Sequence, residues 1–433
     1  MLAQYFKFKE LNTNFRQETI AGLTTFLTIV YIIVVNPKIL EAAGIPFGPS
    51  VVATILTTGF GTLLMGVYAR RPFAVAPYMG QNAFIAYTLV KVMGYSWQVA
   101  LGGVFISGLV FTLLTLTHIR SWLVHAIPDE LKIAFSAGLG LFLSFIGLNV
   151  SGIVQMGVHE APVRVGYLTH PDVFLAILCF LLMSSLLIRK IKGAIFMGLM
   201  GITILAIVCG MLRLPHVLVS LPPDIRPILG HLDIMGALQV KFLPIVLLMF
   251  ILIFVDTTGT LLGMSLKAGF LDEKGNLPEM KKPMMCDSLT TMIGAFLGTT
   301  TSGVYLESLA GIEAGGRSGF TAVVTALLIL AALFFAPLFA IIPAYAYGPA
   351  LMIVGMLMMS TIKQLNVEDL TEWIPTFVTL TMITFTYNLG IGMTAGFIIY
   401  PLIKVLSGQY KEVSTGTWVL AAISLLFFIY YPY

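Results

Sequence analysis

The chain has 433 residues, of which 58% are hydrophobic and only 10% are charged; its mean hydropathy is +0.96 and its formal net charge is +4. A soluble domain of this length cannot cover its surface with so few charged side chains. The composition therefore excludes a soluble fold and predicts a multi-pass protein of the lipid bilayer, with no nucleic-acid partner.

Apolar stretches recur along the whole chain, and a helical span needs about 20 such residues. The predicted spans cover 17–36, 50–69, 75–90, 95–117, 130–149, 171–188, 193–212, 242–264, 284–298, 303–315, 318–340 and 345–362. A last apolar block, 373–431, holds two or three more, with a break expected at Asn388–Gly396. We therefore expect about fourteen spans, joined by loops too short for a separate soluble domain.

The distribution of basic residues predicts the orientation. The first span ends in VVNPKIL, which lacks the small residues of a cleavable signal. Up to residue 283, thirteen Lys and Arg lie in loops on the amino-terminal side and six on the other. The thirteen are Lys7, Lys9, Arg16, Arg70, Arg71, Arg120, Arg189, Lys190, Lys192, Lys267, Lys274, Lys281 and Lys282. Basic loops stay in the cytoplasm, so we expect a cytoplasmic amino terminus in a bacterial plasma membrane.

Two spans are interrupted by prolines, glycines or hydroxyl residues. ARRPFAVAPYMGQNAFIAY carries Pro72 and Pro77 ahead of Gly80, and GTTTSGVYLESLAGIEAGG carries the polar tract 299–302 ahead of Glu307. Each is expected to form an extended stretch followed by a half-helix. Backbone of this kind survives at membrane depth only when it is buried in protein or lines a cavity.

A faint internal duplication relates these two segments. Ile127-Pro128 and Ile342-Pro343 are 215 residues apart, Met65-Gly66 and Ile293-Gly294 are 228 apart, and Asn82 and Glu307 are 225 apart. Each half would contain about seven spans, an odd number, so the second half would be inverted. Inverted repeats with paired broken spans are typical of secondary transporters.

Asp256 and Glu307 are carboxylates within otherwise apolar spans. A carboxylate at the bilayer centre costs roughly 2.5–3.5 kcal/mol on insertion scales, so such residues tend to line polar pathways. The alternatives are structural: Asp256 bonded to Thr257, Thr258 or backbone, or Glu307 paired with a buried base. For Asn82, the alternative is an amide that only satisfies the broken backbone.

Other polar and small residues have simpler interpretations. Glu313 and Arg317 are interpreted as a local ion pair at the end of the second half-helix. Asp287 is interpreted as a helix-start residue. Gly259 and Gly263 form a small-xxx-small step, for which helix packing is the favoured interpretation.

Enzyme and metal signatures are missing from the sequence. There is no H-E-x-x-H, G-x-S-x-G, Walker or dinucleotide motif, so no enzyme activity, cofactor or metal is expected. Cys179, Cys209 and Cys286 are interpreted as packed thiols. Without a nucleotide site, an ion gradient is the expected energy source. Carboxylates suit protons, whereas the oxygens of the 299–302 tract would also suit sodium.

At these motifs the chain resembles the nucleobase–cation symporters, specifically the AzgA-like hypoxanthine/guanine/adenine branch. The resemblance covers essentially the whole length. It is carried, in order, by NFRQETIAGLTTFLTIVYIIVVNPKIL, APYMGQNAFIAY, FVDTTGTLLG, AGFLDEKGNLPEMKKPMMCDS and GTTTSGVYLESLAGIEAGGRSGFTAVV.

The resemblance implies an all-α fold of fourteen spans in two inverted seven-span repeats, with broken third and tenth spans. The implied divisions are a cytoplasmic segment 1–16, core 17–117, gate 118–240, core 241–340 and gate 341–433. It further implies secondary active import of purine bases by proton symport, with an elevator-like or rocking movement of the core.

The resemblance places the purine between the two broken spans and the eighth span. By motif, Asp256 is the eighth-span carboxylate, Glu307 the tenth-span carboxylate and Asn82 the third-span amide. The expected substrate contacts also include the backbone at Ala83 and Leu306, a stacking ring from Phe84 or Tyr305, and Ser302. We expect Glu307 to grip the purine and Asp256 to carry the coupled proton, with either carboxylate left open as the proton carrier.

One departure bears on the substrate. Family members often carry a second polar residue three positions before the eighth-span aspartate, where this chain has Ile253, and the uracil-type histidine of that span is missing. Both differences disfavour a uracil or xanthine carrier. An anion or other-nucleobase transporter of the same fold, with sodium coupling, is the alternative, and a homodimer is left open.

Overall fold

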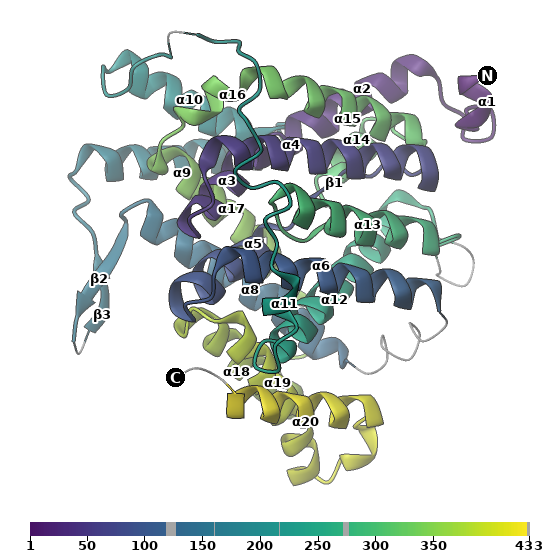
Figure 1. The fold of residues 1–433 in the computed structure, drawn as a ribbon, viewed down its shortest axis with the longest axis vertical. Coiled ribbons are helices and arrows are strands. Elements are labelled where there is room, and N and C mark those ends of the chain that lie inside the picture. Colours follow the sequence, from purple (N-terminus) through teal and green to yellow (C-terminus); the bar gives the residue numbers. More distant parts are fainter. Residues whose placement is uncertain (118–126, 160, 216, 272–276, 431–433) are drawn as a thin grey trace.

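The computed structural model describes residues 1–433 except 118–126, 160, 216, 272–276 and 431–433. Arg120, Lys274, His118, His125 and His216 therefore lie outside the described residues. The protein is mostly helical, and many of its long helices run across the view of Figure 1, roughly perpendicular to the longest axis of the molecule.

The first half contains most of the elements before residue 209. They are α1 (Leu2–Tyr5), α2 (Phe15–Ile29), α3 (Ile32–Ala42), α4 (Phe47–Leu64), η1 (Met65–Ala69), β1 (Val75–Pro77), α5 (Met79–Ala83), η2 (Phe84–Val92), α6 (Trp97–Leu116), α8 (Asp129–Val150), β2 (Val154–Val158), β3 (Ala161–Val165), α9 (Pro171–Ile188) and α10 (Ala194–Val208).

The second half begins with the short helix α11 (Ile234–Ala237). It continues with α12 (Leu243–Ala268), α13 (Lys281–Leu297), β4 (Ser302–Val304), α14 (Ser308–Glu313), α15 (Gly319–Ala331), η3 (Ala332–Phe335), α16 (Ala336–Ala340), α17 (Ala344–Met359), η4 (Ser360–Gln364), α18 (Leu370–Phe385), α19 (Leu389–Leu406), η5 (Tyr410–Glu412) and α20 (Thr415–Tyr430).

Nine helical segments in the described part of the chain are long and apolar enough to cross a bilayer. They are Phe15–Ala42, Phe47–Ala69, Trp97–Leu116, Asp129–Val150, Pro171–Ile188, Leu243–Leu266, Gly319–Ala340, Ala344–Gln364 and Leu389–Leu406. Ala194–Val208 and Thr415–Leu426 are shorter apolar helices. A multi-pass membrane protein is confirmed by these segments, whereas the count of fourteen spans stays a prediction.

The carboxyl-terminal block is more helical than the sequence suggested. The chain breaks only at residues 386–388, and α19 then runs through Gly396, so the predicted break at Asn388–Gly396 is too long. Asn388 caps α19 by accepting a hydrogen bond from the backbone N–H of Ile391 at 3.1 Å. The glycines that suggested a break bring α19 close to α18, since a Cβ at Gly392 would meet Ile383.

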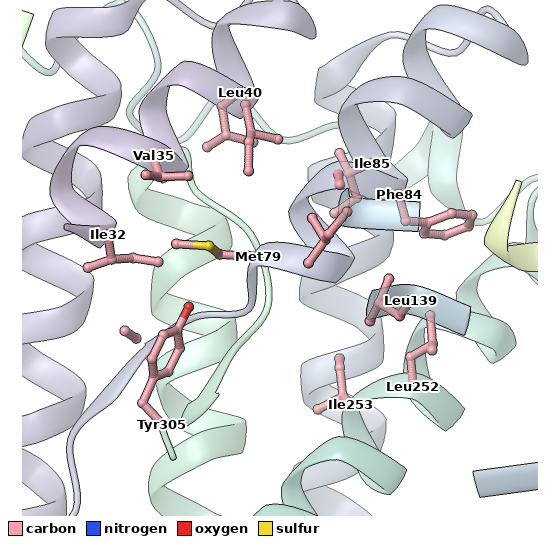
Figure 2. Close-up of a cluster of buried hydrophobic side chains, with 14 of the residues drawn as sticks. Ile32, Val35, Leu40, Met79, Phe84, Ile85, Leu139, Leu252, Ile253 and Tyr305 are labelled. Carbon is pink, nitrogen blue, oxygen red and sulfur yellow. The ribbon is translucent and has the colours of Figure 1, made fainter. Parts of the chain in front are cut away.

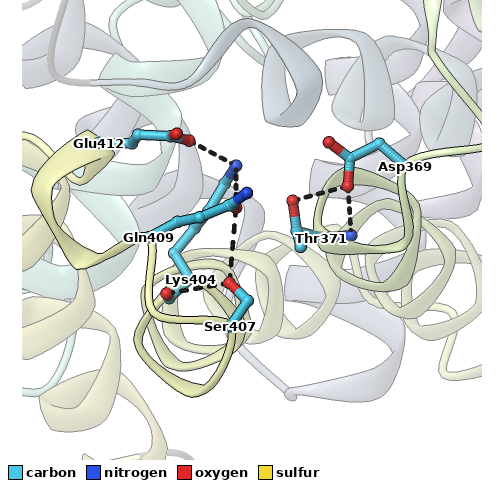
Figure 3. Close-up of polar contacts among 6 residues, drawn as sticks. All are labelled: Asp369, Thr371, Lys404, Ser407, Gln409 and Glu412. Atoms are coloured by element: carbon cyan, nitrogen blue, oxygen red, sulfur yellow. Dashed lines mark hydrogen bonds and ion pairs between the residues drawn. The ribbon is translucent and has the colours of Figure 1, made fainter.

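A buried lysine fixes the end of α19. Lys404 is 3% exposed and donates to Gln409 at 3.1 Å and to Glu412 at 2.8 Å (Figure 3). Beside it, Asp369 caps α18 by accepting from the backbone N–H of Thr371 at 2.8 Å. These contacts satisfy a charge that would otherwise be costly to bury.

Two groups of helices pack separately. In one group, α8 packs against α17 and α18, and α17 also contacts α9 and α10. In the other group, α15 packs against α2 and α4, and α13 packs against α4 and α6. The groups correspond to the residue ranges predicted for the gate and the core. The division into two moving domains stays a prediction.

The contact between α8 and α17 is made by glycines. A Cβ at Gly140 would lie 2.5 Å from the carbonyl of Gly355, and one at Gly147 would lie 2.6 Å from that of Gly348. Gly140 and Gly355 are 215 residues apart, the same offset as the two Ile-Pro pairs that open these helices. This local relation is one that an inverted duplication predicts.

The fold is not wholly α-helical. Strands β2 and β3 form an antiparallel hairpin, which extends away from the helices at the lower left of Figure 1. Strands β1 and β4 form a second small sheet inside the helical body. The all-α prediction therefore holds for the architecture but misses these two pairs.

Candidate functional site

The two broken segments cross each other as a short antiparallel pair. Val75 of β1 faces Val304 of β4, and Pro77 faces Ser302. All six residues of the two strands are buried. The predicted pattern of an extended stretch followed by a half-helix is therefore present in both segments, and the backbone freed from helical bonding finds partners within the protein.

Matched hydrogen bonds hold the two strands. The Thr62 hydroxyl accepts from Val75 N–H at 3.0 Å and donates to Val75 C=O at 3.1 Å. The Thr291 hydroxyl does the same for Ser302, at 3.1 and 3.0 Å. Val75 and Ser302 are 227 residues apart. The crossing therefore has a local twofold arrangement with the offset expected from the duplication.

Two tyrosines stand at the same offset, where the strands end. Tyr78 and Tyr305 stack with ring centroids 6.3 Å apart and planes 13° from parallel. The Tyr305 hydroxyl donates to the carbonyl of Pro77, and the Tyr78 hydroxyl lies 3.5 Å from that of Thr257 on α12. The predicted stacking residue Tyr305 is thus at the crossing, already paired with a second ring.

Asp256 lies on α12 beside the first half-helix. It is half-buried, and its Oδ2 accepts a hydrogen bond from Gln81 Nε2 at 2.8 Å. The predicted structural alternative, a bond to Thr257 or Thr258, is not among its printed contacts in the described chain. Gln81 was not among the predicted site residues, although it lies within the singled-out APYMGQNAFIAY motif.

The helix face that carries Asp256 is open toward its carboxyl end. Gly259 and Gly263 follow Asp256 at three and seven residues, and a Cβ at either would meet nothing within 4 Å. Both glycines are exposed. The interpretation of this step as a helix-packing motif is therefore wrong: among the described residues no helix packs closely there, and the glycines leave space beside the carboxylate.

Glu307 is at the start of the second half-helix. It is the N-cap residue of α14, and its Oε1 accepts from the Tyr31 hydroxyl of α3's N-cap at 2.7 Å. The Thr28 hydroxyl donates to its backbone carbonyl at 3.2 Å. No printed ion pair of the described chain includes Glu307. The preceding residue, Leu306, is 52% exposed.

Asn82 faces away from Asp256. Its Nδ2 donates to Asn36 Oδ1 on α3, and Asn36 in turn donates to Thr54 at 2.8 Å and Thr299 at 3.0 Å. All four side chains are buried. The structure therefore places the predicted third-span amide in a polar network that ties the half-helix to its neighbours, as the structural alternative for Asn82 anticipated.

The remaining predicted contacts are also packed within the protein. Ala83 is fully buried in the last turn of α5, and Phe84 is 1% exposed. Figure 2 shows Phe84 and Tyr305 on opposite sides of Met79. They do not converge on one ring-binding position. The Ser302 hydroxyl donates to the carbonyl of Thr300 at 3.4 Å.

A third buried carboxylate braces the crossing. Asp287 is fully buried six residues into α13, and its Oδ2 accepts from Val304 N–H of β4 at 3.3 Å. The helix-start interpretation of Asp287 is therefore wrong. Its position in a helix that opens with two lysines suggested a terminus, and only the fold shows that this carboxylate reaches the strand.

A fourth carboxylate, Glu18, was missed by the sequence reasoning because it lies in the first turn of a predicted span. It is fully buried and accepts from Ser318 N–H at 3.1 Å, Arg317 N–H at 3.0 Å and the Thr321 hydroxyl at 2.5 Å. It therefore caps α15. Arg317 donates to the carbonyl of Ile312 at 2.8 Å, and an ion pair with Glu313 is not among the contacts of the described residues.

The described residues contain no group of three or more His, Cys, Asp or Glu that could hold a metal ion. Cys179 and Cys286 are buried, as packed thiols would be, whereas Cys209 is exposed. In the described part of the chain, the polar groups that converge from different helices are thus carboxylates, an amide and tyrosines. They can donate and accept hydrogen bonds to a flat, neutral molecule.

Comparison with known proteins agrees with this site. The model of the Permease family matches residues 16–399. The chain is 45% identical to a putative permease of Methanocaldococcus jannaschii over 99% of this chain and 98% of that protein. It is 38% identical to the adenine permease AdeP of Escherichia coli, over 98% and 95%. It is also 38% identical to the guanine/hypoxanthine permease PbuG of Bacillus subtilis, over 98% and 99%.

A solved structure shares the fold. The transmembrane domain of the cyanobacterial bicarbonate transporter BicA superposes with a TM-score of 0.65 at 14% identity, over 88% of this chain and 97% of that one. At this identity the likeness concerns the fold alone.

Proposed function

Because this chain belongs to the permease family of nucleobase–cation symporters, on its hypoxanthine/guanine/adenine branch, we propose that it imports purine bases across the cell membrane by proton symport. The observation that carries the proposal is the meeting of Asp256, Gln81 and the Tyr78–Tyr305 pair at the start of the first half-helix. Relatives with similar sequences carry the names of adenine and guanine/hypoxanthine permeases.

The chemistry of a purine fits these groups. A purine has ring and exocyclic N–H donors and N or O acceptors along a flat edge. A carboxylate accepts N–H groups, and an amide both donates and accepts. Tyrosine rings offer a flat apolar surface. We propose that Glu307 and Asp256 hold the purine between the two half-helices, with Glu307 gripping the base.

The same carboxylates support proton coupling. Neither Asp256 nor Glu307 has a basic partner among its printed contacts; each accepts from a neutral donor. A carboxylate without a fixed cation can gain and lose a proton as its surroundings change. We assign the coupled proton to Asp256, which lies next to the open glycine face of α12.

The proposed movement is that of the core group of helices against the gate group, in an elevator-like or rocking manner. It is supported by the separate packing of the two groups. The short strands and α5 contact α4, α13 and α3, so the site would travel with the core. A homodimer of such units remains part of the proposal.

No observation favours the anion alternative. An anion site at half-helix starts would be expected to use basic or neutral groups, whereas the described residues place carboxylates there. Bicarbonate transport is a property of a protein with the same fold, and it is not carried over to this chain.

The test is uptake by cells that lack their own purine carriers and express this chain. Labelled adenine, hypoxanthine, guanine, xanthine and uracil are offered with and without a protonophore, and with and without sodium. We expect uphill uptake of at least one of the first three bases, abolished by the protonophore and independent of sodium. Uptake of none of these purines would contradict the proposed substrate, and uptake that follows sodium would contradict proton coupling.

A further inference from the structure

We propose that Gln81 is the amide that binds the purine, and that its orientation converts the protonation of Asp256 into a choice of purine edge. This inference rests on the proposed purine transport and deepens it. It replaces Asn82, the residue that the sequence motif favoured, and it assigns Gln81 a role in selectivity.

The two neighbouring amides face different helices. Tyr78 and Gln81 both contact α12, at Thr257 and Asp256. Asn82 contacts α3 at Asn36, and Met79, one turn earlier, lies beside Ile32 and Val35 of the same helix (Figure 2). Consecutive residues of a helix point about 100° apart, so only one of two adjacent amides can face the carboxylate. In this structure it is Gln81.

The Gln81 side chain has one end fixed and one end unpaired. The residue is 2% exposed, and its Nε2 donates to Asp256 Oδ2 at 2.8 Å. Its Oε1 is buried and has no hydrogen-bond partner among the described residues. A buried, unpaired carbonyl costs free energy unless a ligand satisfies it. A purine N–H is such a partner.

The state of Asp256 dictates which end of the amide is free. An ionised carboxylate only accepts hydrogen bonds, so Gln81 must turn its NH₂ toward Asp256 and present its oxygen. A protonated Asp256 can donate its O–H to Oε1, and the amide then turns by half a rotation and presents its NH₂. Gln81 therefore offers an acceptor in one state and a donor in the other.

The groups that surround this pair are few. Around Asp256, α5 contributes Tyr78, α13 contributes Asp287, and the start of α14 contributes Glu307. Helix α6, which packs on α12, has no titratable side chain in its described range. A change of charge at Asp256 is thus felt directly by the one amide bonded to it.

Adenine and hypoxanthine distinguish the two states. The adenine edge has an amino donor at the position where hypoxanthine has a carbonyl acceptor, and the ring nitrogen beside it differs in the opposite sense. A donor and an acceptor from Gln81 therefore favour different bases. We expect the ratio of adenine to hypoxanthine affinity to change with pH, by roughly tenfold across the titration of Asp256.

The experiment measures the dissociation constants of labelled adenine and hypoxanthine from pH 5 to pH 8, for the full chain in lipid vesicles. Gln81→Met keeps the length of the side chain and removes both polar atoms. We expect it to bind the better base about tenfold more weakly and to show one constant ratio at every pH. A variant that keeps the wild-type ratio and its pH profile would overturn the role of Gln81.

Asn82→Ala is the matched neighbour. We expect it to lower the temperature of unfolding, because it removes a buried network, while the folded protein keeps the pH-dependent ratio. The opposite result, in which Asn82→Ala flattens the ratio and Gln81→Met does not, would return the site to Asn82. If the wild type binds neither base at any pH, the proposed function fails and this inference fails with it; if only Gln81→Met behaves as wild type, the inference alone fails.

Discussion

Asp256 and Glu307 each accept a hydrogen bond from a neutral side chain, an amide from Gln81 and a phenol from Tyr31. Their surroundings differ in one respect. Asp256 lies beside exposed glycines of α12, whereas Glu307 caps a half-helix and is bonded at both its carboxylate and its carbonyl. The more open group suits proton exchange, and the more constrained one suits a fixed grip on the substrate.

Substitution of each carboxylate by its amide separates these roles. We expect Asp256→Asn to abolish uphill accumulation while it still exchanges labelled for unlabelled purine across the membrane, because it cannot take up a proton. We expect Glu307→Gln to lose purine binding by about tenfold or more, since a charged acceptor becomes a neutral amide. Accumulation ratios and dissociation constants in proteoliposomes provide the two measurements.

Tyr31→Phe is the control for Glu307, because it removes the phenol's hydrogen bond and keeps the ring. It should weaken binding by only about 0.5–1.5 kcal/mol, the usual net value of one hydrogen bond. Undiminished uphill uptake by Asp256→Asn would contradict its role as proton carrier. A wild-type dissociation constant for Glu307→Gln would contradict its grip on the purine.

The sequence identified both carboxylates but not the amide that bonds Asp256. Carboxylates within apolar spans are conspicuous because burial is costly, so their positions follow from composition. The choice between Gln81 and Asn82 depends on where the half-helix begins, since a shift of one residue turns each side chain by about 100°. Tyr78 sets that start in the structure, and nothing in the motif fixed it beforehand.

At the scale of elements, α12 combines a long apolar stretch with an open glycine face. Helices usually close such faces against a neighbour, and the glycines then allow close approach. Here a Cβ at Gly259 or Gly263 would meet nothing within 4 Å. The face therefore provides room beside Asp256, and we expect it to be part of the route by which purine or proton reaches the carboxylate.

Replacement of Gly259 tests this route. Gly259→Ala should keep uptake and raise helix stability by up to about 1 kcal/mol, because alanine is the better helix former and has space. Gly259→Phe should reduce the uptake rate by roughly tenfold or more, since a bulky ring fills the route. Initial uptake rates and the temperature of unfolding are measured together.

Gly66→Ala is the matched control for an unrelated packing effect. Its Cβ would lie 2.6 Å from the carbonyl of Gly319, so this variant should lose stability, whereas Gly259→Phe should not. If Gly259→Phe transports at the wild-type rate, the open face plays no part in access.

The elements themselves were predicted unevenly. The two broken segments were located from their prolines, glycines and hydroxyl residues, and the structure confirms an extended stretch and a half-helix in each. Their pairing was not predicted, because Val75 and Val304 are far apart in sequence and each strand has only three residues. The break after Thr386 was overestimated, since glycines that pack α19 on α18 resemble glycines that end a helix.

At the scale of the whole molecule, the positive-inside rule predicts that the loop between α9 and α10 lies in the cytoplasm and that the β2–β3 hairpin lies outside. Lys190 belongs to the loop and Arg164 to the hairpin, and both are exposed. The two residues lie on either side of the single helix α9, which allows a direct test of orientation.

Cysteine labelling provides that test. In a background with Cys209→Ser, which removes the exposed native thiol, Arg164→Cys should react with a membrane-impermeant maleimide on intact cells. Lys190→Cys should react only after permeabilisation. Labelling of Lys190→Cys on intact cells, with Arg164→Cys protected, would reverse the orientation.

The pairing of β1 with β4 has a consequence for how the protein is made. The partners of Val75 and Ala76 are Val304 and Gly303, so more than half of the chain must be synthesised before the first strand can pair. Until then the backbone near Pro77 lacks its final hydrogen bonds in a setting without water to replace them. Insertion of the first half therefore cannot complete the transporter, and the site forms only when the second half arrives.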